Sequence, residues 1–285
     1  MARTVIQSFN EFKTKLEITD LQASTVSARH KNVRAVLDGS LTVLESFLSG
    51  SYSRSTMVAP LREADVDVFV VLNSSYYEAG GYATLLDRVK RVLKKEYSTP
   101  KISRNGQAVT ITFSDFKVDV VPSFYRNGGG FLIPNSVQKG WIATDPKQHI
   151  TLFATANQNS KSMLKPVIKM LKNWNKNISF PFNNFHIEVL AYHIFQNVTI
   201  SSYSSGVRYF FDKGRNEIRL KNPDPAGYSD DVGSYLIGKL DDAESQFTTA
   251  YKRALRAEAY EAAGKTEDAI KEWRKIFTAR FPAYG

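Results

Sequence analysis

The segment that most constrains this chain is Asp-Val-Asp-Val-Phe-Val-Val-Leu at residues 65–72. Valine and phenylalanine dominate it, and such a short apolar run is typical of a buried strand. Side chains alternate along a strand, so Asp65 and Asp67 lie on one face while Val66 and Val68 lie on the other. Two carboxylates on one face of an apolar strand repel each other unless water or a cation neutralises them. The segment therefore predicts a core strand with one acidic face.

A third carboxylate stands in a second short apolar run. Residues 116–122 predict another strand, and Asp119 lies within it. If the two strands are neighbours, three carboxylates meet at one place, and hard oxygen ligands without His or Cys suit Mg²⁺. Each acid alone is more typical of a solvated surface. The order Gly50-Ser51, thirteen further residues, Asp-x-Asp and a later Asp in a Val-rich strand favours a metal site.

Composition narrows the class of protein. The 285 residues hold 38 Lys and Arg against 28 Asp and Glu, a formal charge of +10, which favours an anionic partner such as a nucleotide, a nucleic acid or an acidic membrane surface. The absence of Cys excludes a disulfide scaffold, a thiolate zinc site and a Cys nucleophile. The first residues mix charges throughout, unlike a secretory signal, and no run of 18 apolar residues predicts a membrane helix. We expect a cytoplasmic protein without a membrane partner.

Predicted elements alternate between helix and strand in the first half of the chain and are helical in the second. Asn105-Gly106 predicts a hairpin turn. A stretch rich in Gly, Pro and Asn at 126–146 marks a junction, so we assign a sheet-bearing lobe with N-terminal helices to residues 1–140 and a helical lobe to residues 141–285. The fold class is α/β (α+β). From apolar periodicity and turn residues we expect helices at 4–16, 21–37, 84–95, 161–175, 185–197, 231–262 and 267–279, and strands at 41–48, 66–72, 100–104, 108–113 and 116–122.

The stretch Gly-Ser-Tyr-Ser-Arg-Ser-Thr at residues 50–56, combined with the three acids, resembles the polymerase-β-like nucleotidyltransferase superfamily. Within it, the chain is similar to the bacterial cGAS/DncV-like nucleotidyltransferases, the CD-NTases, over nearly its whole length. The resemblance implies a nucleotidyltransferase lobe with a mixed sheet, a helical lobe, and an active site in the cleft between them. Further matching stretches are residues 119–123, 141–146, 164–175, 185–190, 273–277 and 281–282.

The resemblance also implies roles for residues of the first half. Asp65, Asp67 and Asp119 match the family's catalytic, metal-binding triad, which would hold two Mg²⁺ ions, with Mn²⁺ as an alternative. Ser51 matches the serine that holds the donor phosphates. Gly50 permits close approach of a phosphate because it has no Cβ.

Two positions of the second half correspond to further contacts with the donor nucleotide, and this chain departs from the family at one of them. Lys172 matches a lysine that contacts the donor triphosphate, and it shares one helix face with Lys165 and Lys169. For Lys165, a substrate contact and a purely solvated position are equally consistent with the spacing. Asn184 stands where the family often has Ser before Phe-His-Ile-Glu, and its amide still offers a hydrogen-bond donor.

The function implied by the resemblance is synthesis of a cyclic oligonucleotide from NTPs with release of pyrophosphate, in anti-phage defence signalling (CBASS). A nucleic acid is not required for it, and a regulatory protein partner is not specified by the sequence. Two alternatives lie in the same superfamily: a tRNA-end nucleotidyltransferase, and an antitoxin-like enzyme that adds nucleotides to protein or RNA. A third is a nucleic-acid-binding protein without catalysis, which draws on the +10 charge.

Other chemically notable residues favour structural roles. His149, His186 and His193 show no metal-ligand spacing, so we expect them to pack or to lie at the surface. The aromatic residues at 203 and 209–211 offer faces on which a base would stack. At helical spacing, however, such residues are more often core, and we expect that role here.

Overall fold

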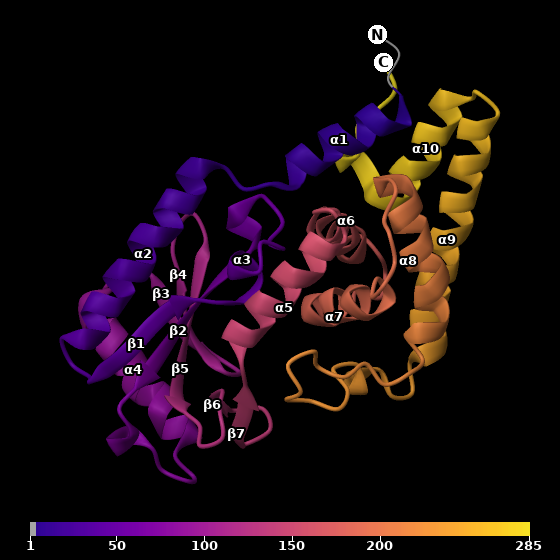
Figure 1. The fold of residues 1–285 in the computed structure, drawn as a ribbon. Coiled ribbons are helices and arrows are strands. Elements are labelled where there is room, and N and C mark those ends of the chain that lie inside the picture. Colours follow the sequence, from indigo (N-terminus) through magenta and orange to yellow (C-terminus); the bar gives the residue numbers. More distant parts are fainter. Residues whose placement is uncertain (1–3) are drawn as a thin grey trace. The chain divides into compact units, whose positions relative to one another are not determined.

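The computed structural model describes residues 4–285, which divide into two compact units (Figure 1). Residues 18–150 form a unit built on a β-sheet, and residues 4–17 together with 151–285 form a helical unit. The fold class predicted from the sequence is therefore confirmed. Within residues 4–285, no helix is both long and apolar enough to span a membrane.

The division of the chain differs from the predicted lobes in two places. The sheet unit extends to residue 150, because β6 (Phe131–Asn135) and β7 (Gly140–Thr144) form an antiparallel hairpin that continues from the sheet. Helix α1 (Val5–Leu16) belongs to the helical unit, where the ring of Phe9 meets that of Trp273 edge-on at 5.0 Å. Contacts with neighbouring residues, and not position in the sequence, determine to which unit the β6–β7 hairpin and helix α1 belong.

The sheet has the strand order β1-β2-β5-β4-β3, with β6 and β7 continuing from β5. Strands β2 and β5 run parallel, and the other pairs are antiparallel. The predicted hairpin is confirmed, because Asn105 pairs with Ala108 around Gly106, whose φ is +58°. The first five strands are β1 (Val43–Leu48), β2 (Asp65–Leu72), β3 (Lys101–Asn105), β4 (Ala108–Thr112) and β5 (Lys117–Tyr125).

Two helices cover one face of this sheet, α2 (Asp20–Asp38) and α4 (Tyr82–Glu96) (Figure 1). Val66 and Val68 of β2 are fully buried in a cluster with apolar side chains of both helices. Their burial fixes the rotation of the strand. Since side chains alternate, the two acids of β2 are turned to the opposite face of the sheet.

The helical unit has an aromatic core. The ring of Trp174 lies 4.9 Å from that of Phe211 and 5.2 Å from that of Phe247, centroid to centroid, and all three are buried. The helices are α5 (Pro146–Asn159), whose first residues belong to the sheet unit, α6 (Leu164–Lys176), α7 (Asn184–Ile194), α8 (Tyr203–Glu217), α9 (Leu240–Ala262) and α10 (Thr266–Phe277).

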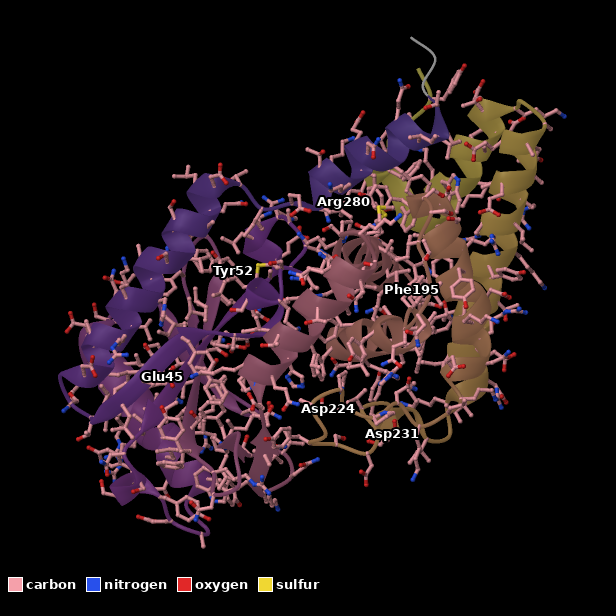
Figure 2. The ribbon with its side chains drawn as sticks, in the orientation of Figure 1. Glu45, Tyr52, Phe195, Asp224, Asp231 and Arg280 are labelled. Carbon is pink, nitrogen blue, oxygen red and sulfur yellow. The ribbon has the colours of Figure 1, made fainter. Side chains whose placement is uncertain are left out.

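The predicted helix at 231–262 begins later than expected, because residues 218–239 form a loop and a short 3₁₀ turn. Asp224 and Asp231 organise this loop (Figure 2). The Asp231 carboxylate accepts from the backbone N–H groups of Asn222 and Gly233, at 3.1 and 2.8 Å. These bonds satisfy backbone groups that a helix would otherwise pair.

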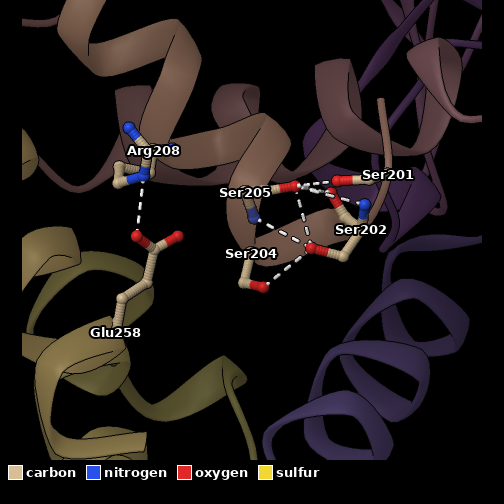
Figure 3. Close-up of polar contacts among 6 residues, drawn as sticks. All are labelled: Ser201, Ser202, Ser204, Ser205, Arg208 and Glu258. Carbon is tan, nitrogen blue, oxygen red and sulfur yellow. Dashed lines mark hydrogen bonds and ion pairs between the residues drawn. The ribbon is translucent and has the colours of Figure 1, made fainter. Parts of the chain in front are cut away.

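Helix α8 was not predicted, because serines and glycines dilute its apolar pattern. It begins with a capping box in which Ser202 and Ser205 exchange side-chain and backbone hydrogen bonds (Figure 3). Figure 3 also shows Arg208 of α8 reaching Glu258 of α9, with N and O 2.7 Å apart. Gly214 lies directly beneath Phe247, where a Cβ would be 2.5 Å from the ring. The glycine that weakens the helix signal thus permits close packing of α8 on α9.

Candidate active site

The parallel pairing of β2 with β5 brings the three predicted acids onto one face of the sheet. Asp67 is in register with Asp119, and Asp65 is in register with Lys117. The hypothesis that the two acid-bearing strands are neighbours is therefore confirmed. On the far side of β5, Thr110 of β4 is the register partner of Asp119.

The Gly50-Ser51 motif begins a single helical turn, α3 (Gly50–Ser53), directly beside β2. Gly50 has φ +62°, and an ideal Cβ at this position would lie 1.7 Å from Asp67 Oδ2. The Ser49 N–H donates to the Asp67 carbonyl at 2.9 Å, which ties the turn to the strand. Figure 2 labels Tyr52 on the same turn, and its ring packs against the sheet core. Residue 50 therefore needs glycine both for its backbone conformation and to make room for Asp67.

Asp119 is the most enclosed of the three acids. It is 8% exposed, and burial is the main cause that raises the pKa of its carboxyl above the usual range. The Thr110 hydroxyl donates to Asp119 Oδ1 at 2.5 Å and opposes this effect, whereas the negative charge of Asp65 adds to it. Asp65 is half-exposed, and its carboxylate lies 3.8 Å from Lys117 Nζ.

Within residues 4–285, no group of three or more histidine or acidic side chains lies close enough together to hold a metal ion. The carboxylates are spread, with Asp65 near Lys117 and Asp67 over Gly50. The donor set itself, carboxylate oxygens on one face of two paired strands, has the chemistry that Mg²⁺ requires.

The acidic face continues into a cavity of about 470 Å³ towards the sheet edge at β3. Two of the acids, Asp65 and Asp119, line it together with three cationic side chains, Lys101, Arg104 and Lys117. Carboxylates and cations in one depression form a surface on which a polyanion and a cation can be bound together.

The three lysines of α6 are placed in different surroundings within the helical unit. Lys172 Nζ donates to Glu188 of α7 at 2.9 Å, and the two side chains are 7% and 1% exposed. Lys169 forms an ion pair with Glu17. Lys165 forms no ion pair within the described residues, and burial, followed by the charge of Lys169, lowers the pKa of its amine. The predicted shared face is confirmed, but the pairing of Lys172 with Glu188 was not visible in the sequence.

Asn184 is the first residue of α7, and Asn183 caps that helix by accepting from the Phe185 N–H at 2.8 Å. The side-chain amide of Asn175 donates to Asn184 Oδ1 at 3.1 Å and to the Phe182 carbonyl at 2.8 Å. Asn184 is thus held by the end of α6. Its predicted contact to the donor nucleotide stays a prediction.

The sequence reasoning missed Thr110. A signal for it exists in the chain, because β4 and β5 are joined by a tight turn closed by the Phe113 N–H on the Phe116 carbonyl at 3.1 Å. Counting outwards from that turn places residue 110 opposite residue 119.

The three histidines named in the sequence analysis have the following surroundings. His186 is buried, its Nδ1 lies 3.0 Å from the Tyr235 hydroxyl, and burial lowers its pKa to about 4. His193 Nε2 lies 2.8 Å from the Pro223 carbonyl, and His149 is buried on α5. Phe210 and Phe211 are buried, as expected of core residues, whereas Tyr203 and Tyr209 are only partly buried.

Comparison with known proteins shows which sequences and folds this chain is similar to. The model of the Second Messenger Oligonucleotide or Dinucleotide Synthetase domain matches residues 3–157. A cyclic AMP-AMP-AMP synthase of Acinetobacter sp. is 26% identical over 306 aligned positions, which cover 98% of this chain and 86% of that protein.

Several solved structures have a fold similar to that of this chain. CdnC of E. coli MS115-1, solved with ATP, has a TM-score of 0.80 at 18% identity and covers 98% of this chain and 99% of its own. The same protein in complex with HORMA-deltaN has a TM-score of 0.79, again at 18% identity, with 98% of both chains covered. DncV of Vibrio cholerae, a cyclic AMP-GMP synthase solved with the linear intermediate pppA(3′,5′)pG, has a TM-score of 0.77 at 14% identity, with 99% and 97% covered.

Proposed function

Since the chain belongs to the Second Messenger Oligonucleotide or Dinucleotide Synthetase domain family and is a nucleotidyltransferase of the CD-NTase class, we propose that it joins NTPs into a cyclic oligonucleotide and releases pyrophosphate. The observation that carries this proposal is the register of Asp67 with Asp119, beside Gly50-Ser51. It sets the acids of two strands next to the motif that matches the family's phosphate-binding serine.

We propose that Asp65, Asp67 and Asp119 hold two Mg²⁺ ions, for which Mn²⁺ can substitute. When bound, the ions supply Lewis acidity and neutralise charge at a phosphoryl centre. The chain's own residues do the positioning. Gly50 leaves room for the Asp67 carboxylate, and the Ser51 hydroxyl would donate to a phosphate of the donor nucleotide.

The proposed reaction is a nucleotidyl transfer that takes place more than once in the synthesis of each product. A nucleotide 3′- or 2′-hydroxyl attacks the α-phosphorus of an NTP and forms a new P–O bond. The bond from the α-phosphorus to the oxygen that bridges it to the β-phosphorus breaks, pyrophosphate leaves, and the hydroxyl proton passes to water. Repeating this step within one linear product closes the ring. The cationic side chains Lys101, Arg104 and Lys117 lie beside Asp65 and Asp119, and their charge favours the phosphates of a nucleotide at this face.

We further propose a role in anti-phage defence with a regulatory protein partner. E. coli CdnC, whose fold is similar to that of this chain, has been solved in complex with HORMA-deltaN, and this complex supports a protein partner. Nothing in the proposed reaction requires a nucleic acid.

The test is incubation of the purified chain with each NTP and each pair of NTPs in Mg²⁺, in Mn²⁺ and in EDTA. A product that resists phosphatase, together with pyrophosphate, supports the proposal. If label appears only on added tRNA or on a protein, a tRNA-end or antitoxin-like nucleotidyltransferase replaces it. RNA binding with a steep salt dependence and no NTP turnover would establish the non-catalytic alternative.

A further inference from the structure

The acidic face is organised in cross-strand rows. One row contains Ser103 of β3, Thr110 of β4, Asp119 of β5 and Asp67 of β2, each in register with the next. The neighbouring row has Thr112 of β4 beside Lys117 and Asp65. The same residue type, threonine, thus stands on β4 once next to a buried carboxylate and once next to an exposed cation.

Thr110 is bonded to Asp119 in a way that selects between its two oxygens. The hydroxyl donates to Oδ1 at 2.5 Å, and Thr110 is 6% exposed while Asp119 is 8% exposed. Within the described residues, Oδ2 accepts no hydrogen bond. One lone pair of Oδ1 is therefore engaged by the protein, whereas Oδ2 keeps both of its lone pairs for an external partner.

The geometry of this contact is fixed in advance by the backbone. Threonine is β-branched, so its χ1 is restricted in a strand, and the register of β4 with β5 sets the separation of the two residues. A buried carboxylate that must serve as a cation ligand also loses solvation, and a hydroxyl donor compensates part of this loss.

We propose that Thr110 is the positioning residue of Asp119: it holds the carboxylate by Oδ1 and so fixes the direction in which Oδ2 is presented to a divalent cation. This inference rests on the proposed function, because it takes Asp119 as a metal ligand. Thr110 lines the same cavity as Asp119, and the role proposed for it is exercised through Asp119 and not as a ligand of the cation. Its effect is on metal affinity, and it acts only through the side chain of Asp119.

The test measures Mn²⁺ binding to the nucleotide-free protein, with free Mn²⁺ followed by its electron paramagnetic resonance signal. Thr110→Val keeps the shape of the side chain but removes the donor, and we expect its Mn²⁺ dissociation constant to rise about tenfold. Thr110→Ser retains the hydroxyl and should stay within about twofold of wild type. Thr112→Val is the matched control, since it makes the same change two residues away on the same strand face.

Asp119→Asn separates failure of this inference from failure of the proposed function. If Asp119→Asn binds Mn²⁺ as well as wild type does, the metal site of the proposed function is wrong. If Asp119→Asn loses affinity while Thr110→Val does not, the metal site stands and the role of Thr110 is overturned.

Two further outcomes also reject the role of Thr110. One is an equal loss in Thr112→Val, which would indicate a general effect of the strand. The other is an equal loss in Thr110→Ser, because that variant keeps the hydroxyl and the hydroxyl would then not account for the effect. Thermal melting accompanies each titration. Should Thr110→Val not fold, the comparison of Thr110→Ala with Thr110→Ser gives the same decision.

Discussion

The carboxylate of Asp67 lies in the space that a side chain at residue 50 would fill: an ideal Cβ on Gly50 would be 1.7 Å from Asp67 Oδ2 and 2.7 Å from Cγ. The contact joins the start of α3 to the acidic strand. It makes Gly50 part of the arrangement of the acids, in addition to the phosphate-approach role that the sequence resemblance implies.

Gly50→Ala should therefore slow nucleotidyl transfer and also lower the free energy of unfolding, and the two effects have separate causes. The positive φ of +62° costs an L-residue about 1–2 kcal/mol, and the clash forces Asp67 to move. A displacement of this size at a reacting centre lowers turnover by about a hundredfold. Pyrophosphate release and thermal unfolding of the same variant measure the two effects.

Gly106 provides the matched control for this substitution. Its φ is +58°, but a Cβ there would meet nothing within 4 Å. Gly106→Ala should lose a similar amount of stability, because its φ is also positive, but its turnover should stay near normal. Equal activity losses in the two variants would refute the displacement of Asp67.

Asp67→Asn should abolish most activity without weakening the fold. It keeps the side-chain shape but removes one of the like charges on the acidic face, so the free energy of unfolding without metal should hold or rise. Loss of several kcal/mol of transition-state stabilisation corresponds to a rate loss of about a hundredfold or more. Near-normal pyrophosphate release from a variant that unfolds more easily would show that Asp67 has a structural role instead.

The sequence allowed prediction of the strands that carry the acids but not of their register. Alternation in residues 65–72 orients Asp65 and Asp67, because it depends only on local geometry. The pairing of Asp67 with Asp119 depends on which strand inserts beside β2. That choice is made by packing across the sheet, and no local pattern records it.

The errors in the second half have a similar cause. Residues 126–146 are rich in turn formers and indicated a junction, yet they fold as the β6–β7 hairpin, because Phe131 and Ile133 are buried against Phe69 of the sheet. The ion pair of Lys172 with Glu188 joins two helices, so neither helix predicts it alone.

The buried ion pair of α6 and α7 leads to a prediction about Lys172. Lys172→Met should destabilise the helical unit by about 3–5 kcal/mol, because it removes the cation that forms an ion pair with the buried Glu188. The double variant Lys172→Met/Glu188→Gln should recover much of that loss. Chemical denaturation of the three proteins measures both steps.

The same double variant tests the predicted contact of Lys172 with the donor triphosphate. If that contact exists, the recovered protein will still show a raised KM for NTP. If stability and KM return together, Lys172 is a structural residue, and the donor contact inferred from the resemblance is wrong.

The last prediction concerns acid sensitivity and follows from His186. Burial lowers its folded-state pKa from 6.5 to about 4, so the folded protein disfavours the imidazolium. Between these values the unfolded chain binds more protons than the folded one, and stability therefore falls as pH falls. The contribution is fully present above about pH 6.5 and is lost progressively towards pH 4, by about 3 kcal/mol in all.

Tyr235, bonded to Nδ1, and the nearby Asp231 are the groups that face the ring of His186. His186→Phe loses the Tyr235 hydrogen bond at every pH but should show a shallower decline between pH 6.5 and 4 than wild type in urea titrations. Parallel slopes for wild type and His186→Phe would contradict the assignment.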